Sequence, residues 1–102
     1  MIRHVVLFKL KSGIESKAVE HVFSALKDLA QKIPGIISIS TGHDNSPEGL
    51  QRRNTHGFTV DFENSAARDD YLPHPAHQAV GKMIVGITEG GVDGITVLDW
   101  EF

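Results

Sequence analysis

The residues best suited to chemistry lie close together at positions 69–77, which read Asp-Asp-Tyr-Leu-Pro-His-Pro-Ala-His. This segment holds the chain's only tyrosine, Tyr71, and two of its six histidines, His74 and His77. Proline suits the first position of a helix, so Pro75 predicts that a new helix begins directly after His74. His77 would then lie in the first helical turn, where the helix dipole favours a neutral, proton-accepting imidazole. A neutral imidazole beside a phenol predicts acid and base chemistry or the binding of a polar ligand.

The same segment also has a purely structural interpretation. A histidine beside a proline often caps a helix, and a buried tyrosine often uses its hydroxyl to fix a loop. The two interpretations differ in whether the surrounding elements bring further polar side chains to the segment.

The chain has the size and composition of one ordinary globular domain, which we assign to residues 1–102. Hydrophobic residues make up 40% of it, charged residues 23%, and the formal net charge is −3. No basic patch is interleaved with aromatic residues, so nucleic acid is not expected as a partner. No apolar stretch is long enough to cross a bilayer and no signal-peptide pattern is present, so we expect no membrane partner and a cytoplasmic location.

The absence of cysteine restricts the chemistry to histidine, tyrosine and carboxylate side chains. His74 and His77 lie across a helix boundary instead of four residues apart on one helix face, and no carboxylate completes a ligand set. We therefore expect no metal and no other cofactor. His21 and His43 are expected to be exposed. No serine lies at a strand-to-helix elbow, so a serine triad is not supported.

Hydrophobic periodicity predicts the elements that position these residues. Four runs are alternating or rich in β-branched residues and are expected to be strands: 2–10, 36–41, 55–62 and 92–102. Three segments are expected to be helical: the one between Ser12 and Pro34, then 64–72 and 75–87. Ser12 and Glu15 have the spacing of a capping box. This order predicts a ferredoxin-like α+β protomer, with a four-stranded antiparallel sheet and helices on one face.

Both faces of the first predicted strand carry apolar side chains. Val5 and Leu7 lie on the face opposite Val6 and Phe8. Helices on one side leave the other side uncovered, so we expect a homodimer through the sheet face, forming a dimeric α/β barrel.

Strand alternation also predicts a pocket. It places His4 and His56 on the helix-facing side of the first and third strands, which are neighbours in this topology. The two imidazoles are therefore expected side by side, with His74, His77 and Tyr71 approaching from above. The expected pocket residues are Tyr71 and His77 as catalytic candidates, and His4, His56, His74, Phe23, Leu26 and Phe58 as ligand-binding candidates.

Four ordered motifs resemble the stress-responsive A/B barrel (Dabb) domain family, and the likeness spans nearly the whole chain. The motifs are IRHVVLFK at 2–9, SPEGL at 46–50, THGF at 55–58 and YLPHPAH at 71–77. The resemblance implies a ferredoxin-like protomer in a tight homodimer. In the polyketide-cyclase branch of the family, the catalytic tyrosine and histidine fall on the positions of Tyr71 and His77. That implies a reaction in which His77 removes a proton beside a carbonyl and Tyr71 hydrogen-bonds the developing charge.

Three functions remain open at this point. The favoured one is a homodimer that holds a small molecule in the His/Tyr-lined pocket. The second is a cofactor-independent polyketide-cyclase-like lyase that uses Tyr71 and His77. The third is a monooxygenase-like or haem-degrading relative of the same dimeric fold. Leu26 replaces an aromatic residue of the cyclase branch and there is no second tyrosine. Few groups are left to steer a reaction, which favours the binding function.

Overall fold

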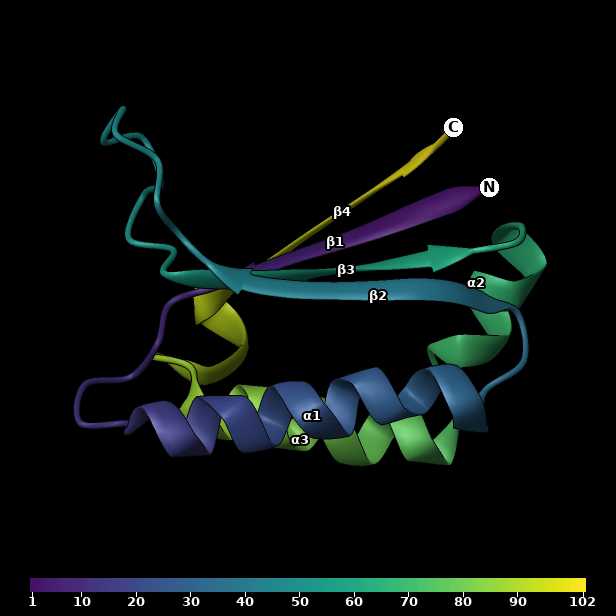
Figure 1. Ribbon diagram of the computed structural model, residues 1–102, viewed down its shortest axis with the longest axis horizontal. Helices are drawn as coiled ribbons and strands as arrows, with labels where there is room; N and C mark the ends of the chain where they lie inside the picture. The colour runs from purple at the N-terminus through teal and green to yellow at the C-terminus, as the bar shows by residue number, and fades with distance from the viewer.

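The strands and helices follow the ferredoxin-like α+β order, in a computed structural model that describes residues 1–102. The elements are β1 (Ile2–Phe8), α1 (Ser16–Lys32), β2 (Ile36–His43), β3 (His56–Phe62), α2 (Ser65–Tyr71), α3 (Pro75–Ile87), the 3₁₀ turn η1 (Gly91–Gly94) and β4 (Ile95–Glu101). The strand order is β2-β3-β1-β4, and all neighbouring strands are antiparallel. Figure 1 shows the sheet as one layer, with α1 and α3 side by side beneath it and α2 at one end. The predicted fold class is confirmed.

The core lies between the sheet and the two long helices. Alternate residues of β1 face the helices and are buried, including Val6 and Phe8. Val22, Leu26 and Leu29 recur at helical spacing on α1 and bury one face of that helix against the sheet. The pattern that predicted an amphipathic helix therefore also determines which face of β1 is covered.

The predicted capping box at Ser12 and Glu15 is wrong. Helix α1 begins at Ser16, and Glu15 is its N-cap residue without any side-chain cap hydrogen bond. The chain first passes through a turn in which Gly13 has φ +83°, a left-handed conformation that favours glycine. This turn separates Ser12 from the helix.

The last strand begins at Ile95, three residues later than predicted. Residues Gly91–Gly94 form η1 instead. A Cβ atom on Gly94 would lie 2.1 Å from the carbonyl oxygen of Glu89, so the close backbone approach in this turn requires glycine. The valine at position 92 is exposed on η1 and does not belong to β4.

The helix boundaries around the Tyr71–His77 segment agree with the sequence. Asn64 caps α2 by accepting a hydrogen bond from the Ala67 backbone N–H at 2.9 Å. Helix α3 begins at Pro75, and the side chain of its N-cap His74 accepts a hydrogen bond from the Ala76 N–H at 3.0 Å. None of the helices is both long and apolar enough to cross a membrane.

The outer face of the sheet carries exposed apolar side chains. Leu7 of β1 and Leu98 and Trp100 of β4 are 39%, 62% and 45% exposed. The long helices α1 and α3 lie on the opposite side of the sheet, and α2 lies at one end of it (Figure 1). On the same outer face, Arg3 forms a two-point ion pair with Asp61, with both N–O distances at 2.9 Å.

Candidate functional site

A cavity of about 470 Å³ lies between α3 and the helix-facing side of the sheet. Its buried lining residues are His4, Val6 and Phe58 of the sheet and Ile84 of α3. Its half-buried lining residues are His77, Gly81, Val85 and Ile95. Its exposed lining residues are Leu72, Gln78, Lys82 and Val97. Because Gln78 and Lys82 belong to α3 and Val97 to the edge strand β4, the cavity opens between those two elements.

His77 is positioned as a hydrogen-bond acceptor toward this cavity. Its Nδ1 lies 2.9 Å from the carbonyl oxygen of Leu72. A carbonyl only accepts, so Nδ1 carries the proton and Nε2 of the neutral ring holds a lone pair. Burial lowers the pKa of His77, opposed by the Leu72 carbonyl and assisted by the nearby His4 and His74. The neutral ring predicted from its place in the first turn is therefore also favoured by its surroundings.

Tyr71, predicted as a pocket residue, contacts His77 but does not line the cavity. The two ring centroids are 4.1 Å apart, and the phenol ring also contacts Phe62 edge-on at 4.9 Å. Tyr71 is fully buried, its hydroxyl has no hydrogen-bond partner, and burial raises its pKa. An unpaired buried hydroxyl costs about 1–3 kcal/mol, so it indicates either stored strain or a role in binding.

A second imidazole, His4, lines the same cavity from β1, with its ring centroid 6.1 Å from that of Tyr71. Its Nδ1 lies 2.7 Å from Oδ1 of Asp99, and Oδ2 of Asp99 accepts a hydrogen bond from Arg68 at 2.9 Å. Burial alone would raise the pKa of Asp99, but the hydrogen bonds from Arg68 and His4 outweigh it and lower that pKa. Because the carboxylate accepts the Nδ1 proton, Nε2 is the nitrogen of His4 left for the cavity.

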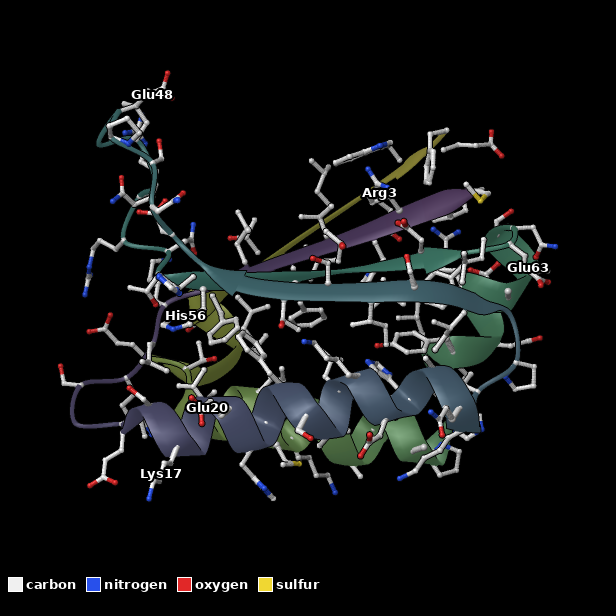
Figure 2. The ribbon with its side chains drawn as sticks, in the orientation of Figure 1. Arg3, Lys17, Glu20, Glu48, His56 and Glu63 are labelled. Carbon is white, nitrogen blue, oxygen red and sulfur yellow. The ribbon has the colours of Figure 1, made fainter.

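The expected neighbouring positions of His4 and His56 are wrong. In the β1–β3 register, His4 pairs with Val60 and His56 pairs with Phe8. Four residues of strand separate the two pairs, which corresponds to about 13 Å. Figure 2 shows His56 at the end of the sheet far from α2. The two imidazoles therefore share a face of the sheet but not a cavity.

His56 belongs to a separate aromatic group. It stacks on Phe8 with ring centroids 5.7 Å apart and contacts Phe23 at 6.2 Å. Its Nδ1 lies 2.8 Å from Oγ1 of Thr55. Burial and, to a smaller extent, His43 lower the pKa of His56. Neither His56 nor Phe23 lines the cavity of His4 and His77.

Leu26 and His74, both predicted to bind a ligand, have structural roles in the core and at a helix cap. Leu26 is 1% exposed in the core and does not line the cavity. His74 uses its ring nitrogen to cap α3, as the structural interpretation of the segment predicts. Phe58 does line the cavity.

As expected, His21 and His43 are exposed. Nowhere do three histidine or carboxylate side chains converge in an arrangement that could hold a metal ion.

Two features of the site were not predicted from the sequence: the cavity wall formed by α3 and the contact of Asp99 with His4. Gln78, Gly81, Lys82 and Val85 line the cavity and recur at i, i+3, i+4 and i+7 counted from Gln78, so the helical period of α3 was a signal for them. Asp99 had no such signal, because its approach to His4 depends on the β1–β4 register.

The four-stranded sheet, its helical layer and the histidine-lined cavity define a ferredoxin-like α+β protein with a ligand-sized hollow. The chain belongs to the Stress responsive A/B Barrel Domain (Dabb) family, whose sequence model matches residues 2–102. Family membership was predicted from the four motifs and is confirmed.

Individual relatives agree with this assignment. The stress-response A/B barrel domain-containing protein HS1 of Arabidopsis thaliana is 28% identical over 100 residues, covering 98% of this chain and 88% of its own. Olivetolic acid cyclase of Cannabis sativa is 29% identical over 80 residues, covering 78% and 79% of the two chains. The crystal structure of a dimeric ferredoxin-like protein from Jannaschia sp. CCS1 has a TM-score of 0.90 and 31% identity, and the match covers 99% and 98% of the two chains.

Proposed function

We propose that this protein is a homodimer that binds a small, mostly apolar molecule in the cavity between α3 and the sheet. The bound molecule donates a hydrogen bond to Nε2 of His77. The observation that carries the proposal is the position of His77, whose ring lines the cavity while Nδ1 is held by the Leu72 carbonyl.

The other cavity walls support a mostly apolar ligand. The lining residues Val6, Phe58 and Ile84 are buried and have no polar side-chain atoms. Each 100 Å² of apolar ligand surface removed from water there contributes roughly 2.5 kcal/mol. A few polar groups in an apolar hollow are the usual composition of a small-molecule site. The imidazoles then determine the orientation in which the ligand is bound.

Two glycines of α3 provide a matched test of this proposal. A Cβ atom on either Gly81 or Gly86 would meet no atom within 4 Å, but only Gly81 lines the cavity. Isothermal titration of 4-butylphenol into the wild-type protein is expected to give saturable binding. Gly81→Leu should abolish this binding by filling the cavity, and Gly86→Leu should leave it unchanged. Equal binding by the wild type and Gly81→Leu would place the probe elsewhere and refute the proposal.

The homodimer is proposed from the outer face of the sheet. Leu7, Leu98 and Trp100 are exposed together on a face that no helix covers. An exposed apolar sheet face of this kind is typical of a protein interface. The Jannaschia relative, described as dimeric, supports the same assembly.

A second candidate function is a cofactor-independent lyase, favoured by the unpaired hydroxyl of Tyr71. The Tyr71 ring lies against the His77 ring, and olivetolic acid cyclase is a relative of this chain. In such a reaction, Nε2 of His77 takes a proton from the carbon next to a carbonyl. Tyr71 is buried and does not line the cavity, so its side chain must turn toward the cavity before its hydroxyl donates a hydrogen bond to the enolate oxygen that forms.

Proton abstraction can be measured apart from binding. With 4-phenylbutan-2-one in D₂O, the lyase function predicts that the protein accelerates deuterium exchange next to the carbonyl. Tyr71→Phe and His77→Phe should each reduce that rate to the buffer rate, while Tyr71→Phe should still bind 4-butylphenol. If exchange is never faster than in buffer but 4-butylphenol binds, the protein binds small molecules without this chemistry.

A further inference from the structure

Lys82 is a cation without an ionic partner at the opening of the cavity. It lines the cavity and is exposed, and it takes part in none of the salt bridges of the protein. Its neighbours three and four residues away on α3 are Gln78, Ala79, Val85 and Gly86, none of which is acidic. The positive charge of Lys82 is therefore not neutralised along its own helix.

The cavity contains no negative charge to balance Lys82. Its lining includes no aspartate or glutamate. Asp99, the carboxylate behind His4, is already bound by both His4 and Arg68. A single cation at the edge of an apolar hollow attracts an anionic group and orients it toward the opening.

We propose that the ligand of this cavity is an amphipathic hydroxy acid whose carboxylate binds Lys82. This inference rests on the proposed binding function and specifies its ligand class. The hydroxyl end binds His77 and the apolar body covers Val6 and Phe58. His77 and Lys82 are five residues apart on α3, or about 7.5 Å along the helix axis. A phenol joined to a carboxylate by a short alkyl chain covers that axial distance, and the long Lys82 side chain must cover the turn of about 140° around the helix.

The test compares two probes that differ only in charge, 3-(4-hydroxyphenyl)propionate and 3-(4-hydroxyphenyl)propanamide. Affinities for the wild-type protein are measured by isothermal titration at low salt. The carboxylate is expected to bind roughly threefold to fivefold more tightly than the amide, as for a solvent-exposed ion pair. Lys82→Met keeps the length of the side chain and should remove this preference. Lys17→Met is the control, because Lys17 lies on α1 and points away from the sheet (Figure 2).

The outcomes separate this inference from the proposed function. A carboxylate preference that is lost in Lys82→Met and kept in Lys17→Met supports the assignment. Equal binding of the two probes to the wild type overturns it and leaves the binding function intact. A preference that survives in Lys82→Met also overturns it. If neither probe nor 4-butylphenol binds, the proposed function fails, and this inference fails with it.

Discussion

At the scale of single residues, the site depends on how each imidazole is held. Nδ1 of His77 is occupied by a backbone carbonyl, and Nδ1 of His4 by the Asp99 carboxylate. Each ring therefore has one determined hydrogen position and leaves Nε2 for a ligand. His74, with the same side chain, has its ring nitrogen occupied by the α3 cap. The hydrogen-bond partner thus determines whether a histidine has a ring nitrogen available to a ligand, as His77 and His4 have, or caps a helix, as His74 does.

The lowered pKa of His77 predicts a pH dependence of stability. In the folded protein its pKa lies below the ordinary histidine value of 6.5, because burial disfavours the charged ring. The stability that this histidine contributes is fully present above about pH 6.5 and is lost as the pH falls through the lowered pKa. Urea unfolding at pH 7.5 and pH 5.0 should therefore show a smaller pH difference in His77→Phe than in the wild type.

Other groups with lowered pKa values do not disturb this comparison. The pKa values of Asp61 and Asp99 are lowered from a starting value of 3.8, so their effect on stability falls below the tested range. The pKa of His56 is lowered from 6.5, but His56 contributes equally to the wild type and to His77→Phe. His21 is exposed on α1 and serves as the control, so His21→Asn should retain the wild-type pH difference. The assignment is contradicted if His77→Phe and the wild type lose the same free energy between the two pH values.

At the scale of elements, helix α3 contributes half of the residues that line the cavity. It begins at Pro75, capped by His74, and presents His77, Gly81 and Ile84 to the cavity at intervals of four and three residues. Glycine at position 81 removes a side chain at the point where the helix faces the hollow. The helix therefore gives up some stability at Gly81 to keep that space open.

This cost predicts a stabilising substitution. Gly81→Ala and Gly86→Ala should each raise the free energy of unfolding by about 0.5–1 kcal/mol, because alanine favours the helix and the added Cβ meets nothing. Gly35→Ala is the opposite case. Its φ of +90° is unfavourable for alanine, and the new Cβ would lie 2.5 Å from Cβ of Ala67. Urea unfolding that showed Gly81→Ala to be destabilising would contradict the open space at this position.

The elements also show how far sequence reasoning reaches. The start of α3 was predictable because proline acts on its immediate neighbours. The alternation of β1 and β3 predicted which face His4 and His56 share. It did not predict their separation, because position along a strand depends on the pairing register. The contact between His4 and Asp99 was not predictable for the same reason, because it depends on the β1–β4 register.

At the scale of the whole molecule, the two faces of the sheet have different roles. The helix-covered face carries the core and the cavity, while the outer face presents Leu7, Leu98 and Trp100 to solvent. The opening of the cavity lies beside β4, the edge strand that also carries Leu98. The opening of the cavity and the proposed dimer interface therefore both involve β4.

The assembly can be tested by placing a charge on the outer face. Light scattering of the wild type is expected to give twice the chain mass of 11.2 kDa. Leu98→Glu should shift the protein to monomer, because a buried unpaired carboxylate is costly in an apolar interface. Val92→Glu changes an equally exposed apolar residue outside the sheet and should remain dimeric. A monomeric wild type would refute the homodimer.

The central claim is that the cavity beside His77 binds a small, mostly apolar molecule, and an amide NMR titration with 4-butylphenol tests it most directly. We expect saturable shifts concentrated at the cavity residues Gly81, Val85, Ile95 and Val97. The shifts should disappear in Gly81→Leu and persist in Gly86→Leu. The absence of saturable shifts, or the same shifts in Gly81→Leu, would contradict the claim.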